Sequence, residues 1–238
     1  MNYFVELMKT YVTKVSIIIP TLNEEKNIRI VLRKIKEFFR QRSYYAYEII
    51  VVDGYSKDKT VEVAKRNGCK ILYDKLGKGS ALIKGMRAAK GEIIVTMDAD
   101  VSQRPVELGL LIEGIRAGYD IVMGSRFIQG GGTEDMSWCR KMGNKFFVTL
   151  VNILWGMHYT DLCYGYRAFR NGVWKKLNLK STGFGIETEI SIKAAKRKLN
   201  VLEVPSFEKK RLHGEGKLKT LKHGWVILKT ILNEILSD

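Results

Sequence analysis

Residues 92–100, with the sequence EIIVTMDAD, form an apolar run of strand length that ends in Asp98 and Asp100. Ligands of open α/β sheets bind outside the carboxyl ends of the strands, which is where such a pair would lie. Side chains alternate along an extended chain, so both carboxylates would point to the same side. They would suit Mg²⁺ or Mn²⁺ bound against a diphosphate. The alternative is an acidic turn that only caps the next helix. The rest of the sequence is needed to distinguish a metal site from such a turn.

Strands and helices alternate on both sides of this run. Strands are predicted at residues 15–19, 48–52, 70–73, 92–98 and 120–123, with helices between them. We expect Pro20 to end the first strand and Asn23 to cap the helix that follows. Apolar strands without polar alternation are typical of a sheet buried on both faces. The sequence therefore predicts an α/β fold, a mostly parallel sheet with helices on both faces.

The pattern changes in the second half of the chain. Helices are predicted at residues 141–155, at 187–198 (amphipathic) and at 218–237 (amphipathic), a strand is predicted at 201–204, and residues 161–170 are rich in glycine and aromatics. No linker separates these segments from the first half. We therefore expect residues 1–238 to form one domain.

The chain is strongly basic, with 41 Lys and Arg against 25 Asp and Glu and a formal net charge of +16. This charge predicts a phosphate-bearing partner, which composition leaves open between nucleic acid, a nucleotide and an anionic membrane. No apolar run approaches the roughly 20 residues of a membrane span, and residues 1–14 lack the features of a signal peptide. Three cysteines without metal-binding spacing indicate a reduced, cytoplasmic setting.

The distinctive polar residues follow the predicted strands directly. They are Asn23, Glu24, Asp53, Asp98, Asp100 and Arg126. Because the carboxyl ends of parallel strands meet at one edge of a sheet, we expect these side chains to form one site.

Six short motifs then point to a known family. They are Pro20-Thr21-Leu22-Asn23-Glu24, Val51-Val52-Asp53, Gly77-Lys78-Gly79, Met97-Asp98-Ala99-Asp100, Gly124-Ser125-Arg126 and Gly165-Tyr166-Arg167-Ala168-Phe169. With these motifs in order, residues 15–218 resemble an inverting glycosyltransferase of the GT-A fold, glycosyltransferase family two. Within that family the chain is most similar to dolichyl-phosphate mannose synthases and related polyprenyl-phosphate glycosyltransferases. The resemblance implies a nucleotide-sugar-binding half at residues 15–126 and an acceptor-binding half at residues 127–217.

The resemblance implies a donor site with the substrate-binding residues Pro20, Leu22, Glu24, Asp53, Lys78, Asp98, Ala99, Arg211 and Lys217. In this site Asp53 would accept a hydrogen bond from the base, and Arg211 and Lys217 would close over the diphosphate. Gly54, followed by Tyr55, stands where the family usually has a second aspartate, so the choice between guanine and uracil stays open.

The resemblance also implies a metal site. Asp98 and Asp100 would bind Mg²⁺ or Mn²⁺, which neutralises charge on the leaving nucleoside diphosphate. Ser102 stands where the most similar mannose synthases have a glutamine ligand, and its neutral hydroxyl would ligate weakly or through water. The identity of the metal therefore stays open.

The implied acceptor is a lipid phosphate. Arg126 and Arg140 would bind it, because a guanidinium fork matches phosphate oxygens, and Arg167 would also bind substrate. A phosphate acceptor is largely ionised at neutral pH and needs positioning more than a general base. We therefore expect Asp100, Arg126 and Arg140 to be catalytic, and His158, His213 and His223 to be structural or on the surface. The expected reaction moves a hexose, mannose before glucose or N-acetylglucosamine, from a GDP- or UDP-sugar to dolichyl or polyprenyl phosphate with inversion.

The predicted C-terminal helix leaves two interpretations open. It packs on the sheet, or Trp225 and its leucines rest in a membrane interface beside the basic residues of 209–222. A chain without a membrane span would lie peripherally on the cytoplasmic face of the membrane. It would need surface attachment or a small membrane-protein partner.

Three other functions fit parts of the sequence. Transfer to a sugar hydroxyl would need a base, for which Glu187 and Asp161 are the candidates. Nucleic-acid binding fits the charge, but no known binding signature is present and the acidic strand ends would repel a phosphate backbone. A nucleotidyltransferase would normally have a glycine-rich loop with a lysine directly after the first strand. Residues 20–24 contain neither glycine nor lysine. We therefore favour transfer to a lipid phosphate, with no nucleic acid partner.

Overall fold

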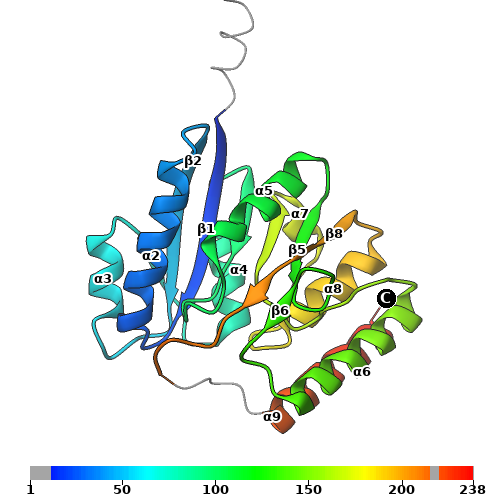
Figure 1. Ribbon diagram of the computed structural model, residues 1–238. Helices are drawn as coiled ribbons and strands as arrows, with labels where there is room; N and C mark the ends of the chain where they lie inside the picture. The colour runs from blue at the N-terminus through cyan, green and yellow to red at the C-terminus, as the bar shows by residue number, and fades with distance from the viewer. Residues whose placement is uncertain (1–11, 215–219, 238) are drawn as a thin grey trace, which may run out of the picture.

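The computed structural model describes residues 12–214 and 220–237, and the predicted α/β fold is confirmed (Figure 1). In these ranges seven strands form one sheet in the order β3-β2-β1-β4-β7-β5-β8. Their bounds are β1 Thr13–Thr21, β2 Tyr45–Asp53, β3 Lys70–Tyr73, β4 Ile93–Thr96, β5 Ile121–Ser125, β7 Arg167–Arg170 and β8 Val201–Pro205. A second, two-stranded sheet pairs β6 (Gly132–Thr133) with β9 (Phe207–Glu208).

The large sheet is mostly parallel, as predicted, with one reversed strand. β1 runs parallel to β2 and β4, β2 to β3, and β5 to β8. β7 lies antiparallel between β4 and β5, with Arg167 opposite Thr96 and Met123. Because β7 starts where β4 and β5 end, the loop before it, residues 161–166, lies at the carboxyl edge of the sheet.

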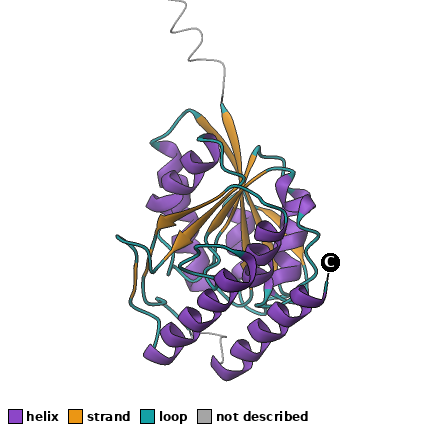
Figure 2. Cartoon of the chain, turned by 90° about the vertical axis from the view of Figure 1, so that its right-hand side faces the viewer, coloured by secondary structure: helices purple, strands orange, loops and turns teal. Residues whose placement is uncertain are grey.

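Helices cover both faces of the sheet (Figures 1 and 2). The helices are α2 Glu25–Arg40, α3 Thr60–Arg66, α4 Lys78–Ala88, α5 Leu108–Arg116, α6 Trp138–Trp155, α7 Val173–Lys176, α8 Ile186–Lys196 and α9 Thr220–Leu236, with a short 3₁₀ turn at Pro105–Glu107. On one face Val15, Ile17 and Ile19 of β1 pack with α2 and α5. On the other face Ile18 of β1 belongs to a cluster with α4, α8 and Ile231 of α9. Alternating side chains of one strand thus belong to two cores.

The first turn after β1 differs from the prediction in two details. Pro20 does not end the strand, because β1 continues to Thr21 in register with β2. Pro20 is tolerated there since pairing with β4 has already stopped at Ile18. Asn23 is not the cap of α2: it has a φ of +55°, and its side chain accepts a hydrogen bond from the backbone N–H of Lys57 at 2.8 Å. Asn23 therefore ties the loop after β1 to the loop after β2.

The helix α8 is not amphipathic as predicted, because it is buried on all sides. Glu187, Glu189 and Lys193 are buried along with its apolar residues. The second layer of helices, α6 and α9, lies side by side over it (Figures 1 and 2). The C-terminal helix therefore packs on α6 and α8, while Trp225 on its outer side is 67% exposed.

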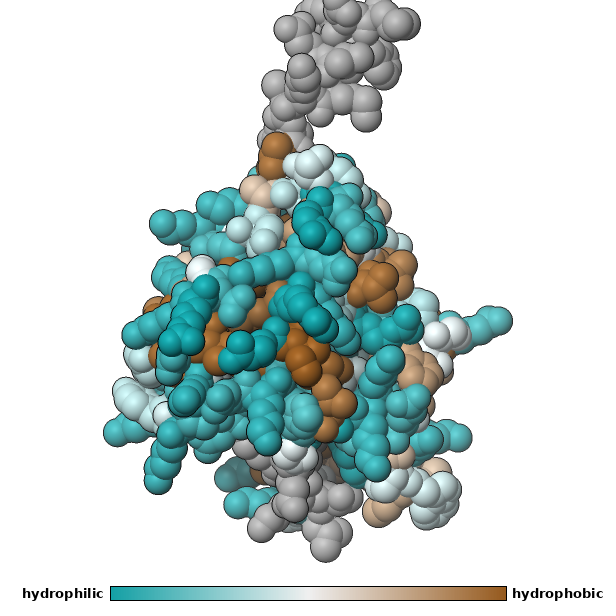
Figure 3. Space-filling model, turned by 60° about the vertical axis from the view of Figure 1, so that its left-hand side comes forward, coloured by the Kyte–Doolittle hydropathy of each residue, from teal (hydrophilic) through white to brown (hydrophobic). Residues whose placement is uncertain are grey.

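Most of the surface seen in Figure 3 is hydrophilic, as the high net charge leads one to expect. None of the helices within residues 12–214 and 220–237 is long and apolar enough to cross a membrane.

Candidate active site

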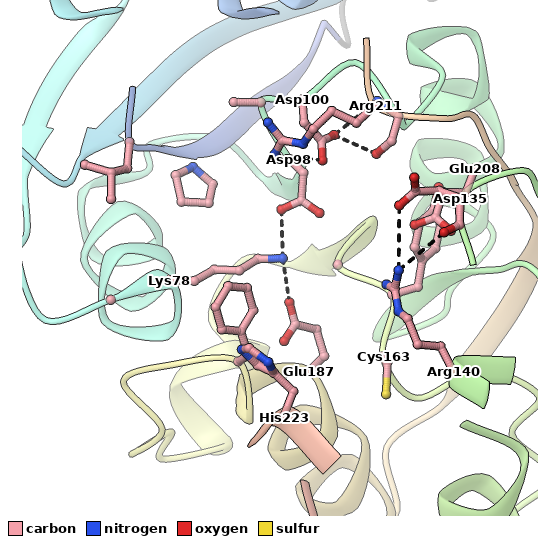
Figure 4. Close-up of a pocket in the computed structure, with 18 of the residues that line it drawn as sticks. Lys78, Asp98, Asp100, Asp135, Arg140, Cys163, Glu187, Glu208, Arg211 and His223 are labelled. Atoms are coloured by element: carbon pink, nitrogen blue, oxygen red, sulfur yellow. Dashed lines mark hydrogen bonds and ion pairs between the residues drawn. The ribbon is translucent and has the colours of Figure 1, made fainter. Parts of the chain in front are cut away.

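A pocket of about 540 Å³ opens at the edge of the sheet where β1, β4 and β5 end, with α4, α6, α8 and α9 contributing to its wall (Figure 4). The predicted site residues that line it are Pro20, Leu22, Glu24, Lys78, Asp98, Ala99, Asp100, Ser102, Arg126, Arg140 and Arg211. The structure thus brings most of the predicted site residues together in one pocket. Their individual roles stay predictions.

Lys78 reaches the pocket because the turn before α4 packs closely against another loop. Gly77 has a φ of +127°, a conformation that favours glycine, and a Cβ on it would lie 2.8 Å from the carbonyl oxygen of Thr182. A Cβ on Gly79 would clash with the carbonyl oxygen of Ser181. The two glycines therefore let α4 begin against this loop, and its first side chain points into the pocket (Figure 4).

The Lys78 ammonium lies between two carboxylates. Its Nζ is 2.7 Å from Asp98 Oδ1 and 2.9 Å from Glu187 Oε1. Burial opposes the charged form, but the attraction of Asp98 and Glu187 outweighs it and raises the pKa of Lys78. Burial likewise raises the pKa of Asp98, although Lys78 acts in the opposite direction. Lys78 is therefore a fixed positive charge inside the pocket at neutral pH.

The aspartate pair after β4 is held in place by its own loop. Asp98 Oδ2 accepts a hydrogen bond from Gln103 Nε2 at 3.0 Å. Asp100 Oδ1 accepts hydrogen bonds from the backbone N–H and the hydroxyl of Ser102, at 3.1 and 2.6 Å. Val101, between Asp100 and Ser102, has a φ of +69°, a conformation that is costly for a β-branched residue. This turn lets Ser102 face Asp100.

The residues of this loop fit a divalent metal that binds together with a phosphate ligand. Carboxylate oxygens such as those of Asp98 and Asp100 are the donors that Mg²⁺ and Mn²⁺ prefer. The Ser102 hydroxyl donates to Asp100 and so orients that carboxylate, while its oxygen lone pairs stay available for the predicted weak ligation. Within the described residues no group of three His, Cys, Asp or Glu side chains forms a closed metal site. Diphosphate oxygens and water would therefore have to complete the coordination, as is usual for Mg²⁺.

Arg211, which follows β9, connects two acidic parts of the site. Its Nη1 lies 3.1 Å from both carboxylate oxygens of Glu24, next to the start of α2. Its Nη2 lies 3.3 Å from Asp100 Oδ2. The predicted partner in the same basic loop, Lys217, lies outside the described residues.

Arg126 is enclosed by two carboxylates. Its Nε and Nη2 donate to Asp161 Oδ2 and Oδ1 at 2.7 and 2.9 Å, and its Nη1 lies 3.1 Å from both oxygens of Glu208. Burial opposes the charge of Arg126, but Asp161 and then Glu208 outweigh it and raise its pKa. The positive charge of Arg126 is therefore already balanced within the protein.

Arg140 has a more open guanidinium. It lies in the first turn of α6, where Ser137 Oγ caps the helix by accepting from the Arg140 backbone N–H. Its Nη1 lies 3.7 Å from Asp135 Oδ2, the one ion pair that Arg140 makes with the described residues, and its side chain is 24% exposed. Of the two arginines predicted to bind the acceptor phosphate, Arg140 has more free hydrogen-bonding capacity.

Two predicted substrate-binding residues do not line the pocket. Asp53 is fully buried, and its carboxylate accepts hydrogen bonds from the Thr21 hydroxyl and from the backbone and hydroxyl of Ser56. Arg167 is 1% exposed and donates mainly to backbone carbonyls of the loop before β7 and of α8. In the structure both residues hold loops of the site in position.

Sequence reasoning missed several side chains that line the pocket. They are Asn144, Phe147, Cys163, Phe184 and His223. His223 of α9 packs its ring edge-on against Phe184, with centroids 4.6 Å apart. Glu187, which the sequence suggests only as a base for transfer to a sugar hydroxyl, lies beside Lys78 (Figure 4). Cys163 lies in the loop before β7 and Phe184 in the turn before α8, and the others lie on helices. None of them belongs to one of the six motifs, so only the tertiary packing reveals them.

The comparison with protein families agrees with this geometry. A mostly parallel sheet with an acidic pair at a strand end, beside lysine and arginine side chains in the same pocket, is suited to a nucleotide-dependent transferase. The family described as "Glycosyl transferase family 2" matches residues 16–177. The chain belongs to this family and is a glycosyltransferase.

Two curated relatives are similar over most of this chain. The chain is 36% identical over 214 residues to a dolichol-phosphate mannosyltransferase of Pyrococcus furiosus, covering 87% of this chain and 59% of the relative. It is 30% identical over 216 residues to a polyprenol monophosphomannose synthase of Mycolicibacterium smegmatis, covering 85% of this chain and 80% of the relative. The chain thus spans little more than half of the first relative.

Solved structures confirm the GT-A fold. Glucosyl-3-phosphoglycerate synthase from Mycobacterium tuberculosis, crystallised with Mn²⁺, UDP and glucosyl-3-phosphoglycerate, superposes with a TM-score of 0.73 at 21% identity. The match covers 97% of this chain and 82% of that protein.

Proposed function

We propose that this glycosyltransferase transfers a hexose, mannose in the first place, from a GDP- or UDP-sugar to dolichyl or polyprenyl phosphate. One observation carries the proposal: the aspartate pair, Lys78 and Arg140 share a single pocket at the carboxyl edge of the sheet. In this pocket Asp98 and Asp100 suit a metal-bound donor, and the partly exposed guanidinium of Arg140 suits an anionic acceptor. The names of the two curated relatives support mannose as the sugar and a polyprenol phosphate as the acceptor.

On the donor side, the chain's own residues would bind and orient the nucleotide sugar. Pro20, Leu22 and Glu24 line the pocket at the end of β1. Asp98 and Asp100 would hold Mg²⁺ or Mn²⁺, which when bound neutralises charge on the leaving diphosphate. Arg211 adds a guanidinium that matches phosphate oxygens.

On the acceptor side, Arg140 would bind the lipid phosphate and aim one of its oxygens at the anomeric carbon. An ionised phosphate oxygen attacks without losing a proton, so the reaction needs no general base. In-line displacement would invert the anomeric configuration. Arg126 already donates its hydrogen bonds to Asp161 and Glu208. It would therefore fix the positions of these two carboxylates on the acceptor side of the pocket.

Transfer to a sugar hydroxyl is the second candidate, and one observation favours it. Glu187 lies in the pocket, and within the described residues its Oε1 has no directed hydrogen bond, although Lys78 is 2.9 Å away as an ion pair. Such a carboxylate is a candidate base. The Lys78 ammonium already lies against this oxygen, however, where an acceptor hydroxyl would have to bind.

We further propose that the enzyme works peripherally on the cytoplasmic face of the membrane, as one catalytic domain. The outer sides of α6 and α9 expose large apolar side chains, namely Trp138, Met142, Phe146, Ile153, Trp225, Leu232 and Leu236. The first three are spaced by four residues and so lie on one side of α6. Exposed apolar residues beside the lysines of these helices are typical of helices in a membrane interface. A small membrane protein would bind the same surface in place of lipid.

A transfer assay tests the proposed function. Purified protein is mixed with Mn²⁺, polyprenyl phosphate in detergent and a panel of labelled GDP- and UDP-hexoses, and the label in the organic phase is counted. The proposal expects organic-phase label from one donor. Label that appears only on added oligosaccharide would favour the second candidate.

A further inference from the structure

The side chain of Arg211 occupies an oxygen that a metal ion would need. Asp100 has two carboxylate oxygens: Oδ1 accepts from Ser102, and Oδ2 lies 3.3 Å from Arg211 Nη2. A divalent ion bound to Asp100 would lie next to the guanidinium. Two cations so close repel each other, and the repulsion is strong where water is partly excluded. Arg211 and the ion therefore compete for Asp100.

Arg211 is held on this side of the pocket by a second carboxylate. Its Nη1 lies 3.1 Å from each oxygen of Glu24, and its side chain is only 16% exposed. Asn27, in the first turn of α2, donates to both Glu24 and the carbonyl oxygen of His213, at 2.7 and 3.0 Å. The segment after β9 is thus fastened to the start of α2 by side-chain and backbone contacts.

A nucleoside diphosphate would remove this competition. It brings several anionic oxygens into the pocket beside Glu24 and Asp100, and a guanidinium binds such oxygens with two parallel hydrogen bonds. Arg211 would then exchange Asp100 for the diphosphate, and Asp100 would become available to the metal. The metal and the nucleotide would each make binding of the other easier, and such coupling is necessarily reciprocal.

We propose that Arg211 makes metal binding depend on the nucleotide, by holding Asp100 until the diphosphate draws the guanidinium away. The proposal rests on the proposed function, in which Asp100 binds a divalent ion and the pocket binds a nucleoside diphosphate. It assigns Arg211 a role in the order of binding, in addition to contact with the donor.

The test is isothermal titration calorimetry. Mn²⁺ is titrated into the protein with and without GDP or UDP, and the nucleotide is titrated into protein saturated with Mn²⁺. In Arg211→Gln, Mn²⁺ alone should bind about tenfold tighter than in the wild type, while the nucleotide should bind about tenfold weaker. Opposite changes in the two affinities are not expected from a variant that merely disturbs the fold. Lys209→Gln removes the same charge two residues earlier, outside the pocket, and should change both affinities by less than about twofold.

Two results would overturn the proposal. If Mn²⁺ binds with the nucleotide but its affinity without nucleotide is equal or lower in Arg211→Gln, the competition is absent and the proposed function stands. If Mn²⁺ binds to neither protein in the presence of GDP or UDP, the metal site of the proposed function is itself wrong.

Discussion

Lys78 Nζ lies 2.7 Å from Asp98 Oδ1, although the two residues come from different strand–helix units of the sheet. The contact joins the glycine-flanked turn before α4 to the acidic loop after β4. Glu187 of α8, 2.9 Å from the same ammonium, adds a segment from the second half of the chain. One lysine thus connects three segments on which the pocket depends.

Replacement of this lysine should impair catalysis. Lys78→Met leaves two carboxylates facing each other in the pocket, and we expect kcat/KM for the donor to fall about 100-fold. Lys84→Met is the matched control, because Lys84 is on the exposed side of the same helix. Its kcat/KM should stay within about twofold of the wild type. Initial rates over a range of donor concentrations measure both, and an active Lys78→Met enzyme would contradict the role of the contact.

The two acceptor arginines should respond differently to substitution. Arg126→Gln leaves Asp161 and Glu208 buried without their partner, which should lower the free energy of unfolding by about 3–5 kcal/mol. Arg140→Gln should change it by less than about 0.5 kcal/mol and instead raise the KM for polyprenyl phosphate about tenfold. Urea denaturation and acceptor kinetics measure the two effects. Should Arg126→Gln fold normally and lose acceptor binding alone, Arg126 would be the phosphate ligand.

The buried pair of Glu189 and Lys193 should make stability depend on pH. Burial tends to raise the pKa of Glu189, but the hydrogen bond from Lys193, 2.6 Å away, and those from two backbone N–H groups outweigh it, so the pKa is lowered. A carboxylate with a lowered pKa stabilises the fold above its unfolded value of about 4.3, and this contribution is lost as the pH falls through the folded value. Glu189→Gln should therefore cost about 2–3 kcal/mol at pH 7 and less at pH 4. Urea titrations at both pH values check this, and a cost that grows at low pH would be inconsistent with it.

The exposed apolar side chains of α6 and α9 should mediate membrane binding. We expect Trp138→Ser combined with Trp225→Ser to reduce co-sedimentation with anionic vesicles at least about threefold, because both indoles would leave the interface. Val106→Ser is the control, since Val106 is also exposed, at 58%, but lies beside α5. Equal vesicle binding by the double variant and the wild type would mean that another surface holds the enzyme at the membrane.

Much of the fold could be predicted from local patterns. The apolar runs of β1, β2 and β4 identify buried parallel strands, and residues that follow such strands must lie at one edge. β7 was not predicted, because it has only four residues and begins with the buried Arg167. Its direction depends on pairing between β4 and β5, which no local pattern encodes.

The site could be predicted only in part, for a similar reason. Motifs on strand ends identified Asp98 and Asp100, but the partners of Arg126 are Asp161 and Glu208, which lie 35 and 82 residues further along the chain. Whether an arginine is free to bind phosphate depends on such distant carboxylates. The burial of α8 likewise depends on the helices that cover it, and not on its own sequence.

The most direct test of the central claim, that the acceptor is a lipid phosphate, compares polyprenyl phosphate with the free polyprenol of the same chain length. Purified enzyme, Mn²⁺ and the productive labelled donor are incubated with each lipid, with Asp100→Asn as the inactive control. We predict label in the organic phase with polyprenyl phosphate only, and its loss in the variant. Equal labelling of the free polyprenol, or labelling of neither lipid while a sugar acceptor is labelled, would contradict the account.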